Sequence, residues 1–234
     1  SQRLARVQQA MAASGVDLLF LNASTNLQYL AGIARDEPNY GNTMYPGEWL
    51  TGAWVPQQGA PILTLPRMLA DFHLGAIPGY DVRVLPDAGD PIALARDVLT
   101  ALRVPETARI AVDDRSWAEL VLNVQKLRPA AVLSQASAIM GPLRRIKDEA
   151  EIAVMRRAGA ITEAAYAATL ARLKHGMTNL DLISEVNYQL RKHGSRTHSF
   201  VTSFYNMGRN FPFDFPNREE VLQIPLEPPI SISY

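Results

Sequence analysis

Apolar residues recur at helical spacing through residues 142–194, and this pattern predicts two consecutive helices. Asp148 and Glu151 have the spacing of a capping box at the start of the first helix. The stripe of small and apolar side chains that follows comprises Ile152, Met155, Gly159, Thr162, Ala165 and Ala168. Lys174 and His175 are expected in the last turn of this helix, where a positive charge complements the helix dipole.

Gly176 is expected between the two helices, because glycine suits the left-handed conformation that follows a helix end. Thr178 and Asp181 repeat the capping pattern, and Gly194 ends the second helix. The apolar positions of the second helix are Leu180, Leu182, Ile183, Val186 and Leu190. Periodicity alone indicates no more than two helices that pack in a core.

Residues 1–135 alternate short apolar runs with amphipathic segments, an order typical of an α/β layer domain with a mainly parallel or mixed sheet. The predicted strands are 16–21, 50–55, 61–65, 82–85, 109–112 and 131–133. The predicted helices are 3–14, 66–74, 91–102 and 116–127, with a helical turn at 25–32. We therefore expect a first domain over 1–135, a linker at 136–142 and a second domain over 143–234.

The pattern changes again after Gly194. Residues 197–205 are rich in β-branched and aromatic side chains and predict a strand, and 226–234 predict the start of another. The intervening 206–217 are rich in Pro, Gly and aromatic residues, as is typical of a loop.

Charge and composition narrow the function classes. The chain has 23 Lys and Arg against 23 Asp and Glu, so no basic field attracts nucleic acid or anionic lipid. It has no cysteine, which excludes disulfides and thiolate ligands and fits a cytoplasmic protein. No apolar run approaches the ~20 residues that a membrane span needs. We therefore expect neither a nucleic-acid nor a membrane partner.

Several phrases of the sequence resemble the M24 peptidase family, which includes aminopeptidase P, Xaa-Pro dipeptidase and creatinase. The phrases are the Arg-Ile-Lys run at 145–147, Arg-Arg-Ala-Gly at 156–159 and Gly-Met-Thr at 176–178, together with TNLQYLAG at 25–32. The last resembles an Asn-x-x-Tyr-Leu-x-Gly phrase of the creatinase-type N-terminal domain. The resemblance implies an α/β N-terminal creatinase-like domain followed by the truncated start of an α+β "pita-bread" domain.

The same resemblance implies two divalent metal ions, of the manganese, cobalt or zinc type. In that family the strand after Leu-Glu-Pro leads into the first of five ligands, which are two Asp, one His and two Glu. Aligned without a gap from Leu226, Tyr234 lies just before the first Asp, and a one-residue gap would instead place Ser233 there. On either register no metal ligand lies in the 234 residues. We therefore expect a part of a longer protein that is inactive alone. The lone histidines, His73, His175, His193 and His198, do not form a zinc pair.

Two irregular segments carry the candidate substrate-binding residues, and the catalytic residues are unknown. Residues 35–49 are either a surface loop or a loop that brings Arg35, Tyr40 and Trp49 to a substrate pocket. Phe213 stands where the resembled family commonly has a catalytic His that does not bind metal, three residues before a Pro. Arg209 is placed to engage a substrate carboxylate as a two-pronged donor.

Three functional interpretations remain open from the sequence. The first is a homodimeric metallohydrolase that cleaves peptides at the bond before proline. The second is a creatinase-like hydrolase that acts on a small molecule rather than a peptide. The third is a non-catalytic pseudo-enzyme or dimerisation module. Metal ligands downstream in a longer reading frame would separate the enzymes from the non-catalytic module.

Overall fold

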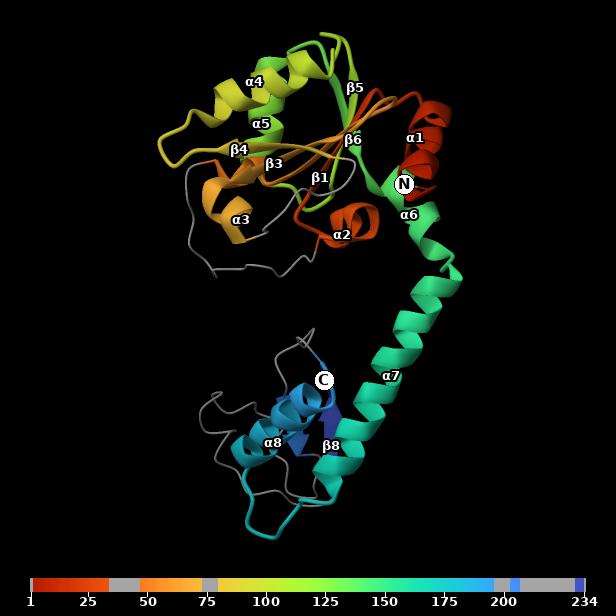
Figure 1. Cartoon of the computed structure of the whole chain (residues 1–234), viewed down its shortest axis with the longest axis vertical. Coiled ribbons are helices and arrows are strands. Elements are labelled where there is room, and N and C mark those ends of the chain that lie inside the picture. The colour runs from red at the N-terminus through yellow and green to blue at the C-terminus, as the bar shows by residue number, and fades with distance from the viewer. Residues whose placement is uncertain (1, 34–46, 73–79, 196–202, 207–229, 234) are drawn as a thin grey trace. The chain divides into compact units, whose positions relative to one another are not determined.

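The computed structural model describes residues 2–33, 47–72, 80–195, 203–206 and 230–233 (Figure 1). Backbone contacts divide the chain into two units, Ser1–Ile146 and Lys147–Tyr234. Each unit is described separately below.

The first unit is built on a mixed sheet of six strands in the order β4-β3-β2-β1-β5-β6. The strands are β1 (Leu18–Asn22), β2 (Gly52–Pro56), β3 (Ile62–Pro66), β4 (Asp81–Leu85), β5 (Arg109–Val112) and β6 (Val132–Gln135). Strands β1, β2 and β3 are antiparallel neighbours, whereas β4 pairs with β3, β5 with β1 and β6 with β5 in parallel. The expected α/β layer domain with a mixed sheet is therefore confirmed.

Helices cover both faces of this sheet (Figure 1). They are α1 (Gln2–Ala13), α2 (Thr25–Ala31), α3 (Arg67–Phe72), α4 (Pro91–Ala101), α5 (Ala118–Leu127) and α6 (Ser137–Arg145), with the short 3-10 helix η1 (Glu48–Leu50). Leu19 and Leu21 of β1 enter a core that also contains side chains of α1, α2 and α6. Leu18 and Phe20 enter a second core with α4, α5 and η1. The alternation follows from the two-residue period of a strand.

A buried hydrogen-bond network ties η1 to the sheet. Trp54 Nε1 donates to Thr64 Oγ1 at 2.9 Å, and the Thr64 hydroxyl donates to the carbonyl of Leu50. Thr64 and Trp54 are both completely buried, so each of these polar groups depends on the other for its hydrogen bond.

The chain between the two units differs from the expected linker at 136–142. Helix α6 occupies most of it, and the units divide after Ile146. Ala136, Ile139 and Met140 have helical spacing and are buried in the same core as α1. The structure accommodates Pro142 inside the helix.

The second unit contains α7 (Glu149–Leu170), α8 (Asn179–Lys192) and an antiparallel pair of strands, β7 (Ser203–Asn206) and β8 (Ile230–Ser233). Both predicted capping boxes are present. Asp148 and Glu151 satisfy each other's backbone N–H groups at the start of α7, and Thr178 and Asp181 do so at the start of α8.

Two expectations for α7 are wrong. The helix ends at Leu170, so Lys174 and His175 lie beyond its last turn. The apolar stripe is buried only near its end, where Ala165 packs with Leu182, Val186 and Leu190 of α8. Met155 is 59% exposed, because α8 covers only the C-terminal part of α7.

We predict that Thr64→Val lowers the free energy of unfolding by about 1–3 kcal/mol, because it leaves the Trp54 N–H and the Leu50 carbonyl buried without a partner. Thr51→Val is the matched control. The Thr51 hydroxyl is also buried but has no hydrogen-bond partner, so this variant is expected within about 0.5 kcal/mol of the parent or more stable. Urea unfolding measures both. Equal losses in the two variants would contradict the assignment of the network.

Candidate functional site

The structure tests only one of the sequence-predicted contact residues. Arg35, Tyr40, Arg209 and Phe213 lie outside the described residues. Trp49 is described and is only 2% exposed, packed in the core under α4 and α5. The expectation that Trp49 reaches a substrate pocket is therefore wrong, because η1 turns its indole into the hydrophobic core.

The first unit brings together a polar cluster that the sequence analysis missed. We call it the switch-point cluster: Ser24, Asn26, Asp113 and Arg144. Ser24 Oγ donates to Asp113 Oδ2 at 2.5 Å, and Asn26 Nδ2 donates to Asp113 Oδ1 at 3.0 Å. Arg144 Nη1 donates to Asn26 Oδ1 at 2.6 Å. Asp113 is only 5% exposed, so its carboxylate depends on these donors in place of water.

The topology explains why these residues meet. Strands β1 and β5 are parallel neighbours, and α2 leaves the carboxyl end of β1 toward one face while α5 leaves β5 toward the other. Open α/β sheets bind ligands at such a switch point, in the crevice between the diverging connections. Asp113 directly follows β5, and Ser24 lies two residues after the end of β1; polar residues near these strand ends were the signal available in the sequence.

The hydrogen bonds of the cluster are satisfied within the protein. Each oxygen of Asp113 already accepts a hydrogen bond, and Ser24 Oγ also accepts from the N–H groups of Asn26 and Leu27 at the start of α2. Nearby, Asp114 Oδ1 accepts the N–H of Ser137 at 3.1 Å, at the start of α6. The polar groups of this edge therefore hold the helices that surround them.

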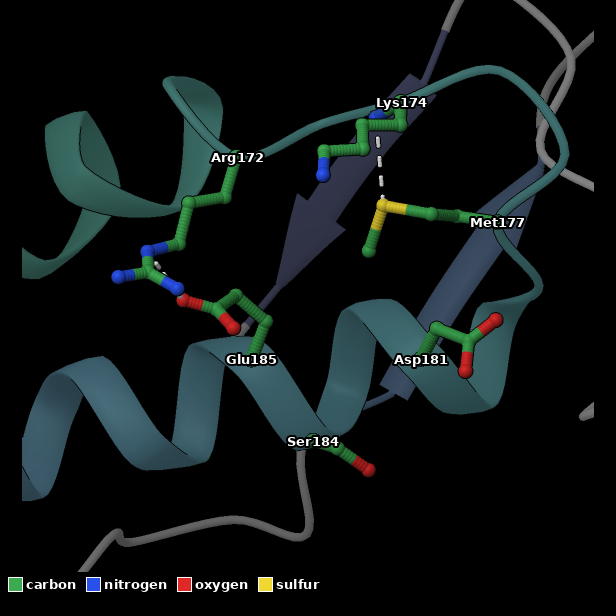
Figure 2. A pocket seen from close by; sticks show the side chains of 6 residues that line it. All are labelled: Arg172, Lys174, Met177, Asp181, Ser184 and Glu185. Carbon is green, nitrogen blue, oxygen red and sulfur yellow. Dashed lines mark hydrogen bonds and ion pairs between the residues drawn. The ribbon is translucent and has the colours of Figure 1, made fainter.

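The second unit has an open hollow of about 480 Å³ between the end of α7 and α8, shown in Figure 2. Its lining residues are Arg172, Lys174, Met177, Asp181, Ser184 and Glu185. Arg172 Nε lies 3.3 Å from Glu185 Oε1, and the backbone N–H of Lys174 donates to Met177 Sδ. The Thr178 backbone N–H and hydroxyl both donate to Asp181, and these bonds lower the pKa of its carboxyl. The hollow is thus lined by the turn that connects the two helices and by side chains of α8, most of them polar.

None of the described residues forms a group of three or more His, Cys, Asp or Glu side chains that could hold a metal ion. His193 caps the C-terminal end of α8 and His175 is exposed, as expected for surface histidines. His73 and His198 lie outside the described residues. The described side chains therefore do not fit a metal pair. In the same residues, no helix is long and apolar enough to cross a membrane.

Comparison with known families decides the assignment. Residues 3–146 match the model of the creatinase/prolidase N-terminal domain. The chain belongs to the creatinase/prolidase family. Residues 153–212 of this family member also match metallopeptidase family M24, so the second unit contains the start of an M24 domain. The fold expected from the sequence resemblance, a creatinase-like α/β domain followed by the beginning of an M24 domain, is confirmed.

Curated relatives of this family member are peptidases by name. It is 29% identical over 204 residues to a probable dipeptidase PepE of Mycobacterium bovis, covering 86% of this chain and 51% of the relative. It is 32% identical over 103 residues to the Xaa-Pro aminopeptidase of Escherichia coli, covering 39% and 23% of the two chains. The chain spans about half the length of the mycobacterial relative.

Solved structures agree on the fold. The prolidase of Thermococcus sibiricus superposes with a TM-score of 0.74 at 18% identity, covering 87% of this chain and 53% of that one. A dipeptidase of Pyrococcus horikoshii gives 0.71 at 21% identity, covering 86% and 52%. PepE of Mycobacterium ulcerans gives 0.61 at 25% identity, covering 87% and 51%.

We predict a pH-dependent loss of protection at the start of α8. Because the pKa of Asp181 is lowered in the folded state, its capping contribution is present above the ordinary carboxyl pKa of 3.8 and is lost as the pH falls through the lowered value. Asp181→Asn removes this titration. Amide exchange is measured at residues 179–183 while the pH is lowered. The protection of these amides should fall with pH in the parent and should depend less on pH in the variant. Identical profiles would contradict the role of Asp181.

Proposed function

We propose that the complete protein is a metal-dependent peptidase of the M24 family that acts on short peptides, with the bond before proline as its preferred site. The observation that carries this proposal is the 29% identity over 204 residues to a probable dipeptidase, which extends across both units. The local identity to a Xaa-Pro aminopeptidase supports the preference for proline.

The proposal assigns the metal chemistry to residues outside the described part of this chain. Divalent ions held by such ligands would supply an activated water for attack on the peptide carbonyl. The manganese, cobalt or zinc type of ion follows from the family resemblance, and we place the ligands beyond the 234 residues. A homodimer in the cytoplasm is part of the same proposal.

The test compares the complete protein with the 234-residue chain. We expect the complete protein to hydrolyse a Xaa-Pro dipeptide when manganese or cobalt is added, to lose this activity with a chelator and to regain it with metal. The 234-residue chain should show only background hydrolysis, because it lacks the ligand set. Metal-stimulated turnover by the short chain would contradict our placement of the ligands, and an inactive complete protein would favour the non-catalytic module.

We further propose that Arg35, Tyr40, Arg209 and Phe213 lie on the substrate side of that active site. Arg209 would bind a substrate carboxylate through two parallel hydrogen bonds. Phe213 would give an aromatic wall where the family commonly has an imidazole, so we expect a narrowed or altered specificity. The competing explanation is that Phe213 packs in the core.

Phe213→His in the complete protein separates the two roles. A pocket role predicts a changed ratio of Xaa-Pro to non-proline turnover with little loss of stability. A core role predicts an unchanged ratio and a loss of about 3 kcal/mol in the free energy of unfolding. Phe215→His, the same change two positions later, is the control for the introduction of an imidazole into this segment. An equal shift in the ratio for both variants would contradict a specific role for Phe213.

A further inference from the structure

The switch-point cluster joins α2 and the carboxyl end of β5 to α6, the last helix of the unit. Asn26 lies in α2, Asp113 follows β5, and Arg144 lies in the last turn of α6. The Arg144 guanidinium therefore occupies the switch point of a sheet whose connections diverge there.

The orientation of the Asn26 amide follows from its two neighbours. A carboxylate only accepts hydrogen bonds and a guanidinium only donates them. The amide must therefore turn its Nδ2 to Asp113 and its Oδ1 to Arg144, as the distances of 3.0 Å and 2.6 Å show. Asn26 is thus a polarised bridge between a buried anion and a cation, and bonds linked in this way strengthen one another.

The end of α6 needs such an anchor. Pro142 has no N–H, so the helix lacks one backbone hydrogen bond just before its last turn. Ile146, which follows the helix, has an extended conformation and is 78% exposed. Ile139 and Met140, the buried side chains of α6, lie before Pro142, whereas Leu143, after it, packs against the same core but is only partly buried. Apolar burial therefore holds the first half of α6 more firmly than its last turn.

We propose that the Asp113–Asn26–Arg144 bridge is a latch that fixes the last turn of α6 to the carboxyl edge of the sheet and so sets the residue at which the first unit ends. Without the latch, the helix frays back to Pro142, and residues 142–147 become a flexible connection. This conformational device is independent of the proposed peptidase activity, because every group in it belongs to the first unit.

Hydrogen–deuterium exchange on the 234-residue chain tests the latch. In Asn26→Ala the amides of residues 143–146 should exchange about tenfold faster, while those of β1 and β5 keep their parental rates. Trypsin should cut after Arg144 and Arg145 correspondingly faster. The matched control is Gln57→Ala, which removes a side-chain amide bonded to the Val16 carbonyl in the same unit. The control should leave residues 143–146 unchanged.

A second variant covers the case in which Asn26→Ala does not fold. Arg144→Met keeps the apolar stem at the outer end of the latch and should release the same amides. The double variant should exchange no faster than Arg144→Met alone, because both changes break one connection. Three results would overturn the proposal. They are parental exchange at 143–146 in Arg144→Met, additive effects in the double variant, and a uniform acceleration of exchange across the sheet.

Discussion

Burial of β1 on both faces is the constraint on which the first unit depends. Leu18, Leu19, Phe20 and Leu21 are all completely buried, and they alternate between the two cores. A shift of one residue in its register would exchange the two sets of side chains. Gly52 reinforces that register, since a Cβ atom there would lie 2.3 Å from the Leu21 carbonyl. The pairing of β1 with β2 and β5 follows from this fixed position.

A charged group is buried next to the carboxyl end of the same strand. Connections that leave toward opposite faces open a space there, and the space holds the buried carboxylate of Asp113. Burying a charge is unfavourable unless it is paired and hydrogen-bonded, and Ser24, Asn26 and Arg144 meet that requirement. Because Arg144 belongs to α6, the hydrogen bonds that stabilise the buried carboxylate also hold the last helix of the first unit, in line with our proposal.

The second unit depends more on local signals than on burial. Two capping boxes define the starts of its helices, and only the end of α7 packs against α8. Its described side chains provide no metal-binding group. Family membership therefore rests on the match of the whole first unit, while the proposed chemistry rests on relatives about twice as long.

The sequence by itself determined the local features of this protein. Apolar periodicity located the strands, and the capping boxes at Asp148 and Thr178 marked two helix starts, because each signal acts over one turn of chain. Only the tertiary structure decided that Trp49 is a core residue, that α7 ends at Leu170, and that α6 replaces the expected linker. The burial of Trp49 and of α6 depends on partners distant in sequence. The bond between Arg144 and Asn26, 118 residues apart, is the clearest case, since no local pattern encodes it.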